Sequence, residues 1–247
     1  MKRKLFTAVC FLLAAAMLPS GASAAGAGKG PKKEVGIQLY SVRSLIGAFG
    51  NNQEDYKPVL KQLADMGYTS VEAASYKEGK IYGQTPEQFR KDVEEAGMKV
   101  LSTHCTINLS DEELAAGDFS KALAWWDECI AAHKAAGAEY IVVPSMRKIS
   151  TLEELATYCR YFNEVGARCK AAGMKFGYHN HSREFEKVED RVMLDYMLEN
   201  TDPDKVFFQM DVYWTVMGQA SPVDYFTKYP GRFRLLHIKD RREVGQS

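Results

Sequence analysis

The chain has 247 residues, of which 46% are hydrophobic and 26% are charged, a composition typical of a soluble globular protein. Its 32 basic and 32 acidic residues balance to a formal net charge of zero. The basic residues form no stripe along the sequence, which argues against a nucleic-acid partner.

The first 24 residues have the three parts of a secretory signal peptide. Residues 2–4 form a basic head, an apolar run covers residues 5–18, and small residues at 22–24 form a cleavage site. The apolar run is too short for a membrane span, although a retained membrane anchor is the alternative. We therefore expect cleavage near Ala24, export to the periplasm without stable membrane insertion, and a flexible leader over residues 25–34.

Loss of this segment changes the charge and the cysteine content. It contains three of the 32 basic residues and no acidic residue, which leaves 29 basic against 32 acidic residues, or a net charge of −3. Four cysteines remain, and their spacing matches no zinc-binding pattern. Two of them, Cys159 and Cys169, are predicted to share one helix, where ten residues of rise separate them by about 15 Å. We expect no disulfide bond among the four, which are Cys105, Cys129, Cys159 and Cys169.

Four segments repeat one local pattern, in which a helical stretch ends at a glycine and a short apolar run follows. Glycine is favoured at the end of a helix because it adopts the left-handed backbone at least cost. One helix and one strand between successive glycines predicts parallel strands joined by right-handed crossovers. The glycines are Gly67, Gly97, Gly137 and Gly173, at intervals of 30, 40 and 36 residues.

The full pattern predicts seven strands and five helices. The strands are expected at 35–40, 70–74, 99–104, 140–144, 175–179, 206–211 and 234–239, and the helices at 56–66, 86–96, 118–136, 151–172 and 190–199. Strands that are apolar on both faces are typical of a buried parallel sheet, so we predict an α/β fold, a (β/α)8 TIM barrel over residues 35–247. A flavodoxin-like or Rossmann sheet is the alternative, but no glycine-rich phosphate loop follows the first strand.

The barrel expected here is truncated. The sequence ends soon after the seventh predicted strand, and roughly 40 further residues would supply the remaining elements of an eight-stranded barrel. A truncated gene model and an open barrel are the two explanations.

Polar side chains gather where the predicted strands end, and these ends form the active-site face of a TIM barrel. Four of the five histidines of the chain lie at these strand ends. The exception is His133, which lies within a predicted helix and is interpreted as a surface or packing residue. Converging imidazoles and carboxylates can bind Mn, Co, Fe(II), Mg or Zn. The residues at strand ends are Gln38, Tyr40, Arg43, Glu72, His104, Ser145, His179, His181, Asp211, His237, Lys239 and Asp240.

Five motifs resemble the xylose-isomerase-like TIM barrel superfamily. They are "VGIQLYSVR", "GYTSVE", "YHNH", "QMDVYW" and "LLHIKD", and the resemblance covers Val35 to Asp240. Members of this superfamily include sugar isomerases and epimerases, inosose dehydratases and endonuclease-IV-type repair enzymes. The resemblance implies a divalent metal ion held by residues from the fifth to the eighth strand.

On this sequence the resemblance makes Asp211 and His237 metal ligands. His179 takes the position at which the epimerase branch usually has a glutamate. His181 lies two residues further along an extended chain, so it faces the same side and is expected to bind metal or substrate. The ligand of the eighth strand, commonly a glutamate, has no counterpart here.

The remaining candidates are assigned to catalysis and substrate binding. Glu72 and His104 are predicted to act as a general base or to contact substrate hydroxyls. Lys239 is predicted to stabilise an oxyanion or to pair with Asp211. The aromatic rings of Tyr40, Tyr213 and Trp214 are expected to stack on a sugar, with packing in the core as the alternative.

The resemblance implies a metal-dependent isomerase or epimerase, and the signal peptide implies that it is exported. Such an enzyme removes a proton next to the carbonyl of a small-molecule, non-phosphorylated sugar. A 3-keto-glycoside lyase or dehydratase with the same first step is one alternative. A non-catalytic carbohydrate-binding or degenerate barrel is the other, and a homo-oligomer is compatible with each. A repair nuclease is disfavoured by the export signal and the charge of −3.

Overall fold

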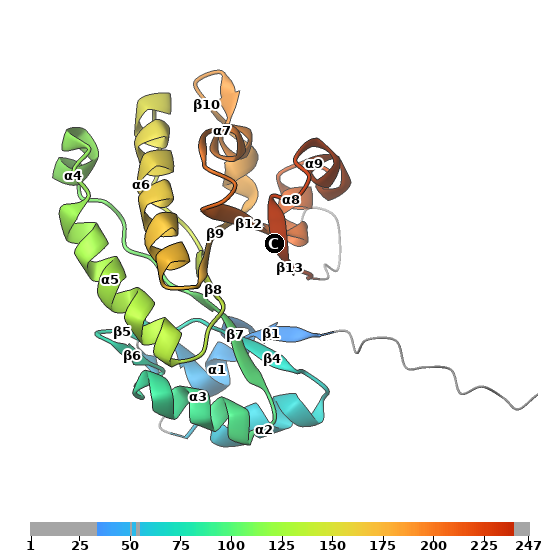
Figure 1. The fold of residues 1–247 in the computed structure, drawn as a ribbon. Helices are drawn as coiled ribbons and strands as arrows, with labels where there is room; N and C mark the ends of the chain where they lie inside the picture. The colour runs from blue at the N-terminus through green and yellow to red at the C-terminus, as the bar shows by residue number, and fades with distance from the viewer. Residues whose placement is uncertain (1–33, 50, 53–54, 240–247) are drawn as a thin grey trace, which may run out of the picture. The chain divides into compact units, whose positions relative to one another are not determined.

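Seven parallel strands form one curled sheet, a half-barrel, in the computed structural model, which describes residues 34–49, 51–52 and 55–239 (Figure 1). The expected signal peptide and all but the last residue of the expected leader lie outside the described residues. The strand order is β1-β4-β7-β8-β9-β12-β13, so β1 and β13 are the edges. The strands are β1 (Gly36–Gln38), β4 (Ser70–Ala73), β7 (Lys99–His104), β8 (Tyr140–Val143), β9 (Lys175–His179), β12 (Val206–Asp211) and β13 (Phe233–His237).

All neighbouring pairs in this sheet are parallel, as the repeat predicts. The four repeated glycines have φ between 78° and 99°, which confirms that each one ends its helix in the left-handed conformation. Within the described residues, three antiparallel strand pairs lie outside the sheet, namely β2 (Gly47–Ala48) with β3 (Asn51–Asn52), β5 (Tyr76–Lys77) with β6 (Lys80–Ile81), and β10 (Lys187–Val188) with β11 (Arg191–Val192).

The five predicted helices are confirmed, with ends that differ by at most three residues. They lie on the outer side of the curled sheet (Figure 1). None of the helices in the described residues is both long and apolar enough to cross a lipid bilayer. The helices are α2 (Lys57–Asp65), α3 (Pro86–Glu95), α5 (Ser120–Ala135), α6 (Leu152–Ala171) and α7 (Met193–Asn200).

Short helical segments after the strands escaped the sequence pattern because each is only four to seven residues long, too short to show a helical apolar face. Ser110 and Glu113 form a capping box at α4, and Asp211 caps α8 by accepting a hydrogen bond from the backbone of Trp214. These segments are η1 (Leu39–Val42), α1 (Arg43–Ile46), α4 (Asp111–Ala116), η2 (Ser182–Phe185), α8 (Val212–Met217) and α9 (Pro222–Lys228).

The two edge strands are shorter than predicted. β1 ends at Gln38, because its side chain accepts a hydrogen bond from the backbone of Tyr40 and so begins the turn η1. β13 ends at His237, whose partner in the register is Asp211. Since the chain turns into α8 after Asp211, β12 offers no further residue for the chain after His237 to pair with.

The hydrophobic core lies between the sheet and the outer helices. Its centre includes three aromatic side chains that are each at most 1% exposed, Trp126 of α5, Phe162 of α6 and Phe176 of β9. The ring of Phe176 meets Trp126 edge-on and Phe162 at a tilt. This packing holds the strands rigidly, so the side chains at their carboxyl ends are fixed in place.

Candidate active site

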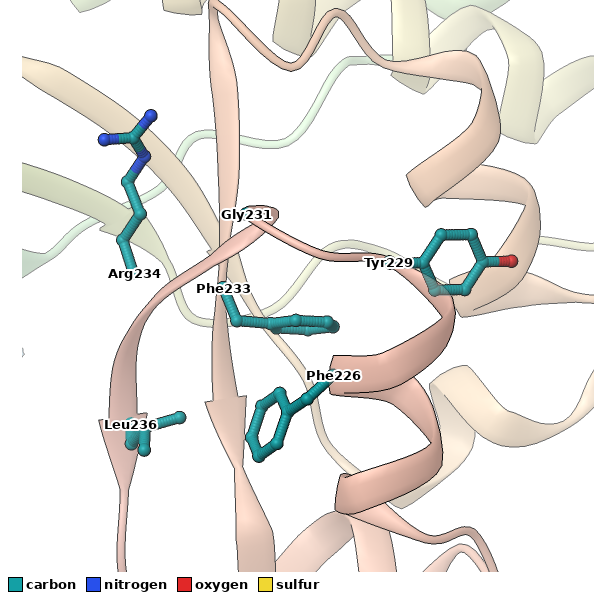
Figure 2. Close-up of a pocket in the computed structure, with 6 residues that line it drawn as sticks. All are labelled: Phe226, Tyr229, Gly231, Phe233, Arg234 and Leu236. Atoms are coloured by element: carbon teal, nitrogen blue, oxygen red, sulfur yellow. The ribbon is translucent and has the colours of Figure 1, made fainter.

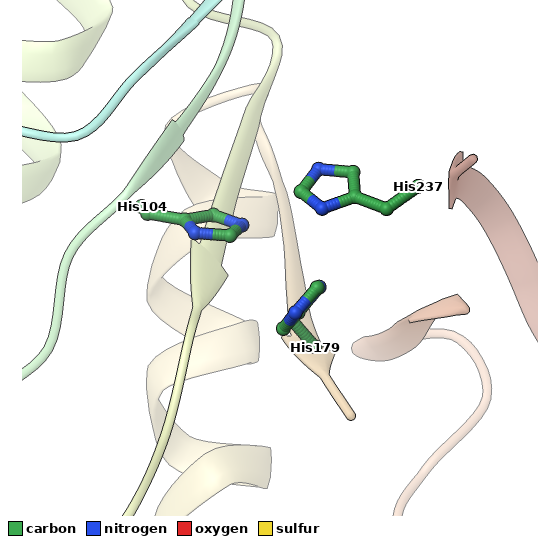
Figure 3. A group of neighbouring side chains, drawn as sticks. All are labelled: His104, His179 and His237. Carbon is green, nitrogen blue, oxygen red and sulfur yellow. The ribbon is translucent and has the colours of Figure 1, made fainter. Parts of the chain in front are cut away.

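A pocket of about 680 Å³ lies at the carboxyl ends of the strands. The imidazoles of His104, His179 and His237 converge there from β7, β9 and β13 (Figure 3). Their ring centroids lie 4.7–5.4 Å apart. The predicted residues that line this pocket are Gln38, Tyr40, His104, Ser145, His179, His181, Trp214, His237 and Lys239. Asp240 lies outside the described residues.

A second hollow, of about 380 Å³, lies beside β13 and α9. Figure 2 shows Phe226 and Phe233 side by side there. The described residues that line it include no histidine and no carboxylate. The four candidate histidines, His104, His179, His181 and His237, all line the first pocket.

Glu72, at the end of β4, binds two of these histidines with one oxygen atom. Its Oε1 lies 3.0 Å from Nε2 of His104 and 2.8 Å from Nε2 of His237. Its Oε2 accepts hydrogen bonds from the Ser102 hydroxyl at 2.6 Å and from the Gln209 amide at 2.8 Å. Both oxygens of this buried carboxylate are therefore occupied by protein groups.

Gln209, a buried residue of β12 that the sequence pattern did not single out, sets the tautomer of His179. Because its Nε2 donates to Glu72, its Oε1 must act as an acceptor. Nδ1 of His179 lies 3.0 Å from that Oε1 and therefore carries the hydrogen. Nε2 of His179 is left with a free lone pair.

Three nitrogen atoms lie around one carboxylate oxygen of Asp211. Its buried Oδ2 lies 3.6 Å from Nε2 of His179 and 3.8 Å from Nδ1 of His237. Since Nε2 of His237 faces Glu72, its Nδ1 carries the lone pair in the neutral ring. Lys239, as predicted, pairs with Asp211, with Nζ 2.6 Å from Oδ2.

This donor set fits a divalent metal ion. Ligand atoms about 2.1 Å from one ion stand roughly 3–4 Å apart, and the two distances to Asp211 fall in that range. Both imidazoles also have their other nitrogen hydrogen-bonded, to Gln209 and to Glu72, as is typical of metal-ligating histidines. The chain therefore brings together the three residues assigned to the metal.

The surroundings lower the pKa of both Glu72 and His179, which favours an ionised carboxylate and a neutral imidazole. Burial opposes ionisation of Glu72, but the charges and hydrogen bonds of His104 and His237 outweigh it and hold its pKa well below the usual range. Burial, with the neighbouring His104 and His237, holds the pKa of His179 well below its usual value. A neutral His179 keeps the lone pair that metal binding needs.

His104 stands between Glu72 and the pocket. Its Nε2 also lies 2.8 Å from Oε1 of Gln209, so this nitrogen carries a hydrogen. Its Nδ1 lies 3.1 Å from Nε2 of Gln38 and accepts a hydrogen bond from that amide. Burial favours the neutral ring, but the Glu72 carboxylate outweighs it and raises the pKa of His104.

Aromatic side chains form the walls of the pocket. The Trp214 ring lies 5.4 Å from the ring of His181, and the Lys239 ammonium lies 5.6 Å from the Trp214 ring. After the edge strand β1, the ring of Tyr40 packs against the ring of Phe49 with their centroids 5.3 Å apart. The Arg43 guanidinium covers the Tyr40 ring, 4.3 Å from its centroid. These rings give the pocket flat apolar surfaces beside its polar floor.

Four further residues named in the motifs or among the strand ends and helices of the sequence are also placed by the structure. Asn180 of "YHNH" accepts a hydrogen bond from the backbone of Asp211 at 3.1 Å and donates one to Thr215, so it ties β9 to the end of β12. His133 is fully buried, which confirms a packing residue and rules out the surface interpretation. Ser145 lines the pocket, whereas Arg43 does not and instead covers the Tyr40 ring.

Comparison with known proteins places these motifs in a family. The model of the xylose isomerase-like TIM barrel matches residues 60–247. Inosose dehydratase from Geobacillus kaustophilus is 25% identical over 200 residues. That alignment covers 74% of this chain and 61% of the relative, so the chain spans less than two thirds of the relative's length.

Solved structures give the same fold. A structure from Parabacteroides distasonis described as a sugar phosphate isomerase/epimerase is 37% identical and has a TM-score of 0.75, covering 87% of this chain and 82% of its own. A second structure of the same description and organism is 33% identical with a TM-score of 0.74, covering 92% and 82%.

Proposed function

This chain belongs to the xylose isomerase-like TIM barrel family, and on that premise we propose that it is a metal-dependent isomerase or epimerase acting on a non-phosphorylated sugar. The proposed reaction begins with removal of a proton from the carbon next to a carbonyl group. The observation that carries the proposal is the position of Glu72, which holds His104 on one side and His237 on the other.

His104 is the proposed proton acceptor. Its Nδ1 lone pair accepts a hydrogen bond from Gln38, a residue that lines the pocket, and its other nitrogen is held by Glu72. A carboxylate behind an imidazole orients the ring and stabilises the imidazolium that forms when the ring takes a proton. A substrate C–H group that displaces Gln38 would meet this lone pair. Glu72 acts as a positioning residue in this proposal, because its own oxygens are occupied.

His179, Asp211 and His237 would hold the metal ion through Nε2, Oδ2 and Nδ1. When bound, a divalent ion polarises the substrate carbonyl and stabilises the negative charge that develops on its oxygen. Lys239 supplies a positive charge at the same place, and the rings of Tyr40 and Trp214 provide faces for the sugar. His181 lies beside Trp214 and is positioned to contact a hydroxyl group.

The proposed substrate lacks a phosphate, although the two solved relatives are described as sugar phosphate isomerase/epimerases. Lys239 is the one lysine or arginine among the described residues that line the pocket, and it is paired with Asp211. A phosphate group would need further positive partners. Export to the periplasm remains part of the proposal, since free sugars and glycosides are the sugars expected there.

A dehydratase or 3-keto-glycoside lyase is the second candidate, and the relative named inosose dehydratase supports it. Proton removal next to a carbonyl is common to both classes. In an elimination, a hydroxyl or glycosidic oxygen on the adjacent carbon then leaves as the double bond forms. The residues that take the proton would be the same.

Exchange of substrate hydrogen with solvent tests the proposal. Ketoses, inososes and 3-keto-glycosides are incubated with the Mn²⁺-loaded chain in D₂O and followed by NMR. We expect deuterium at the carbon next to the carbonyl, with the product separating isomerisation from elimination. His104→Gln should slow the exchange by roughly 100-fold or more while leaving metal content unchanged. Unchanged exchange in this variant would refute the role of His104, and no exchange with any substrate class would refute the reaction.

A further inference from the structure

A second cluster of reactive side chains lies behind the pocket. Cys105 directly follows β7, and Cys129 and His133 lie one turn apart on α5. The sulfur atoms of Cys105 and Cys129 are 3.3 Å apart. Cys105 is 7% exposed and Cys129 is fully buried. None of these residues lines the pocket.

His133 does not complete a metal site with the two thiols. Its Nδ1 lies 2.7 Å from the backbone oxygen of Cys129, which can only accept, so this nitrogen carries a hydrogen. Its Nε2 lies 3.1 Å from the hydroxyl of Thr103 and accepts that hydrogen bond. Both nitrogens are therefore committed to protein groups, and burial raises the pKa of the Cys129 thiol well above its usual value. Metal binding would need a free imidazole lone pair and thiolates.

All four cysteines of the described residues have free thiols in this structure. Against the expectation from the sequence that none of them is joined, we propose that Cys105 and Cys129 are a covalent modification site, at which an oxidant joins the two sulfurs in a disulfide bond between the end of β7 and α5. A disulfide has its sulfurs about 2.05 Å apart, so closure needs an approach of about 1.3 Å. Cys105 follows His104 directly, so the bond would anchor the strand end that carries the proposed proton acceptor to the outer helix.

The oxidant in this proposal is a disulfide, either a small one such as oxidised glutathione or that of a thiol–disulfide oxidoreductase. The thiolate of Cys105, the more exposed of the two, attacks it during folding and forms a mixed disulfide, releasing one reduced thiol. The sulfur of Cys129 then attacks Cys105 and releases the second thiol. Two S–H bonds are lost, one S–S bond forms, and the oxidant is reduced to two thiols.

The other two cysteines of the fold are internal controls. Cys159 and Cys169 lie ten residues apart on α6, which separates them by about 15 Å along the helix axis. No disulfide can join them. Once Cys105 and Cys129 are joined to each other, Cys159 and Cys169 have no cysteine of the fold left to pair with, so their thiols should remain free.

The test is to fold the full chain in a buffer of reduced and oxidised glutathione, block free thiols by alkylation, digest without reduction and identify the peptides by mass spectrometry. We expect one cross-linked pair containing Cys105 and Cys129, about 2 Da lighter than the two thiol peptides together. Cys159 and Cys169 should be alkylated. Cys129→Ser should abolish the cross-link, and the double variant Cys159→Ser/Cys169→Ser should retain it.

Three outcomes would overturn the proposal. Alkylation of both Cys105 and Cys129 in the oxidising buffer would show that the pair does not close. A cross-link from either residue to Cys159 or Cys169 would show a different pairing. Stoichiometric zinc bound to the folded chain and lost in Cys129→Ser would show a metal site instead. The wild-type map alone decides the question if a variant fails to fold.

Discussion

Oε1 of Glu72 lies 2.8 Å from Nε2 of His237, although 165 residues separate the two in the sequence. The same oxygen lies 3.0 Å from Nε2 of His104. One carboxylate therefore orients both the proposed proton acceptor and one proposed metal ligand. The two functions of the site should fail together when this carboxylate is removed.

Glu72→Gln is expected to weaken both. An amide at this position no longer attracts two imidazole N–H groups, so His237 loses the partner that sets its tautomer. Loss of such a partner typically lowers metal affinity by 10- to 100-fold. Titration calorimetry with Mn²⁺ measures this, and deuterium exchange measures the chemistry. Glu87→Gln, on the exposed first turn of α3, is the control and should change neither. Wild-type metal affinity in Glu72→Gln would contradict the arrangement.

The positions of the histidines followed from the sequence because parallel strands of a barrel end on one face. The partners of these histidines did not follow, because they depend on the register between strands. Glu72 lies beside Gln38 on one side and Ser102 on the other, and Gln209 lies beside His179. Such pairings join strands far apart in the sequence, and Gln209 gives no local signal within the otherwise apolar β12.

Lys239→Met is expected to strengthen metal binding. The Lys239 ammonium lies 2.6 Å from Oδ2 of Asp211, the atom assigned to the metal, so it competes for that charge. The lysine side chain is 44% exposed, so solvent screens the pair and the gain should be about 1 kcal/mol, or three- to tenfold in affinity.

Calorimetry with Mn²⁺ checks the prediction for Lys239. Lys228→Met is the matched control, because Lys228 pairs with Asp195 at 2.9 Å away from the pocket. Its metal affinity should equal that of the wild type. Weaker metal binding in Lys239→Met would mean that Lys239 supports the ion instead of competing with it.

His133 should make the fold less stable in mild acid. Burial lowers the pKa of its imidazole to about 4, whereas the unfolded chain keeps a value near 6.5. Between these values the unfolded chain binds the proton and the folded chain does not. The contribution of the neutral ring to the free energy of unfolding is therefore present in full above about pH 6.5 and is lost as the pH falls towards 4.

Urea unfolding at pH 7 and pH 5 measures this contribution. The difference in unfolding free energy between wild type and His133→Gln should fall by about 2 kcal/mol between the two pH values. Thr103→Val, which removes a hydrogen bond to the same ring but keeps the imidazole, should give a difference that changes far less. A constant difference for His133→Gln would mean that the ring is not kept neutral by the fold.

Gly166→Ala should destabilise the protein, against the usual trend for a helix interior, where alanine is favoured by about 1 kcal/mol. A Cβ atom at Gly166 of α6 would lie 2.4 Å from the backbone oxygen of Lys205, directly before β12. Because this neighbour is backbone, α6 or the start of β12 must move, at a cost of roughly 1–3 kcal/mol. Glu164→Ala, exposed on the same helix, should stay within about 0.5 kcal/mol of wild type in urea unfolding. A Gly166→Ala protein as stable as wild type would mean that α6 does not fix the start of the strand that ends at Asp211.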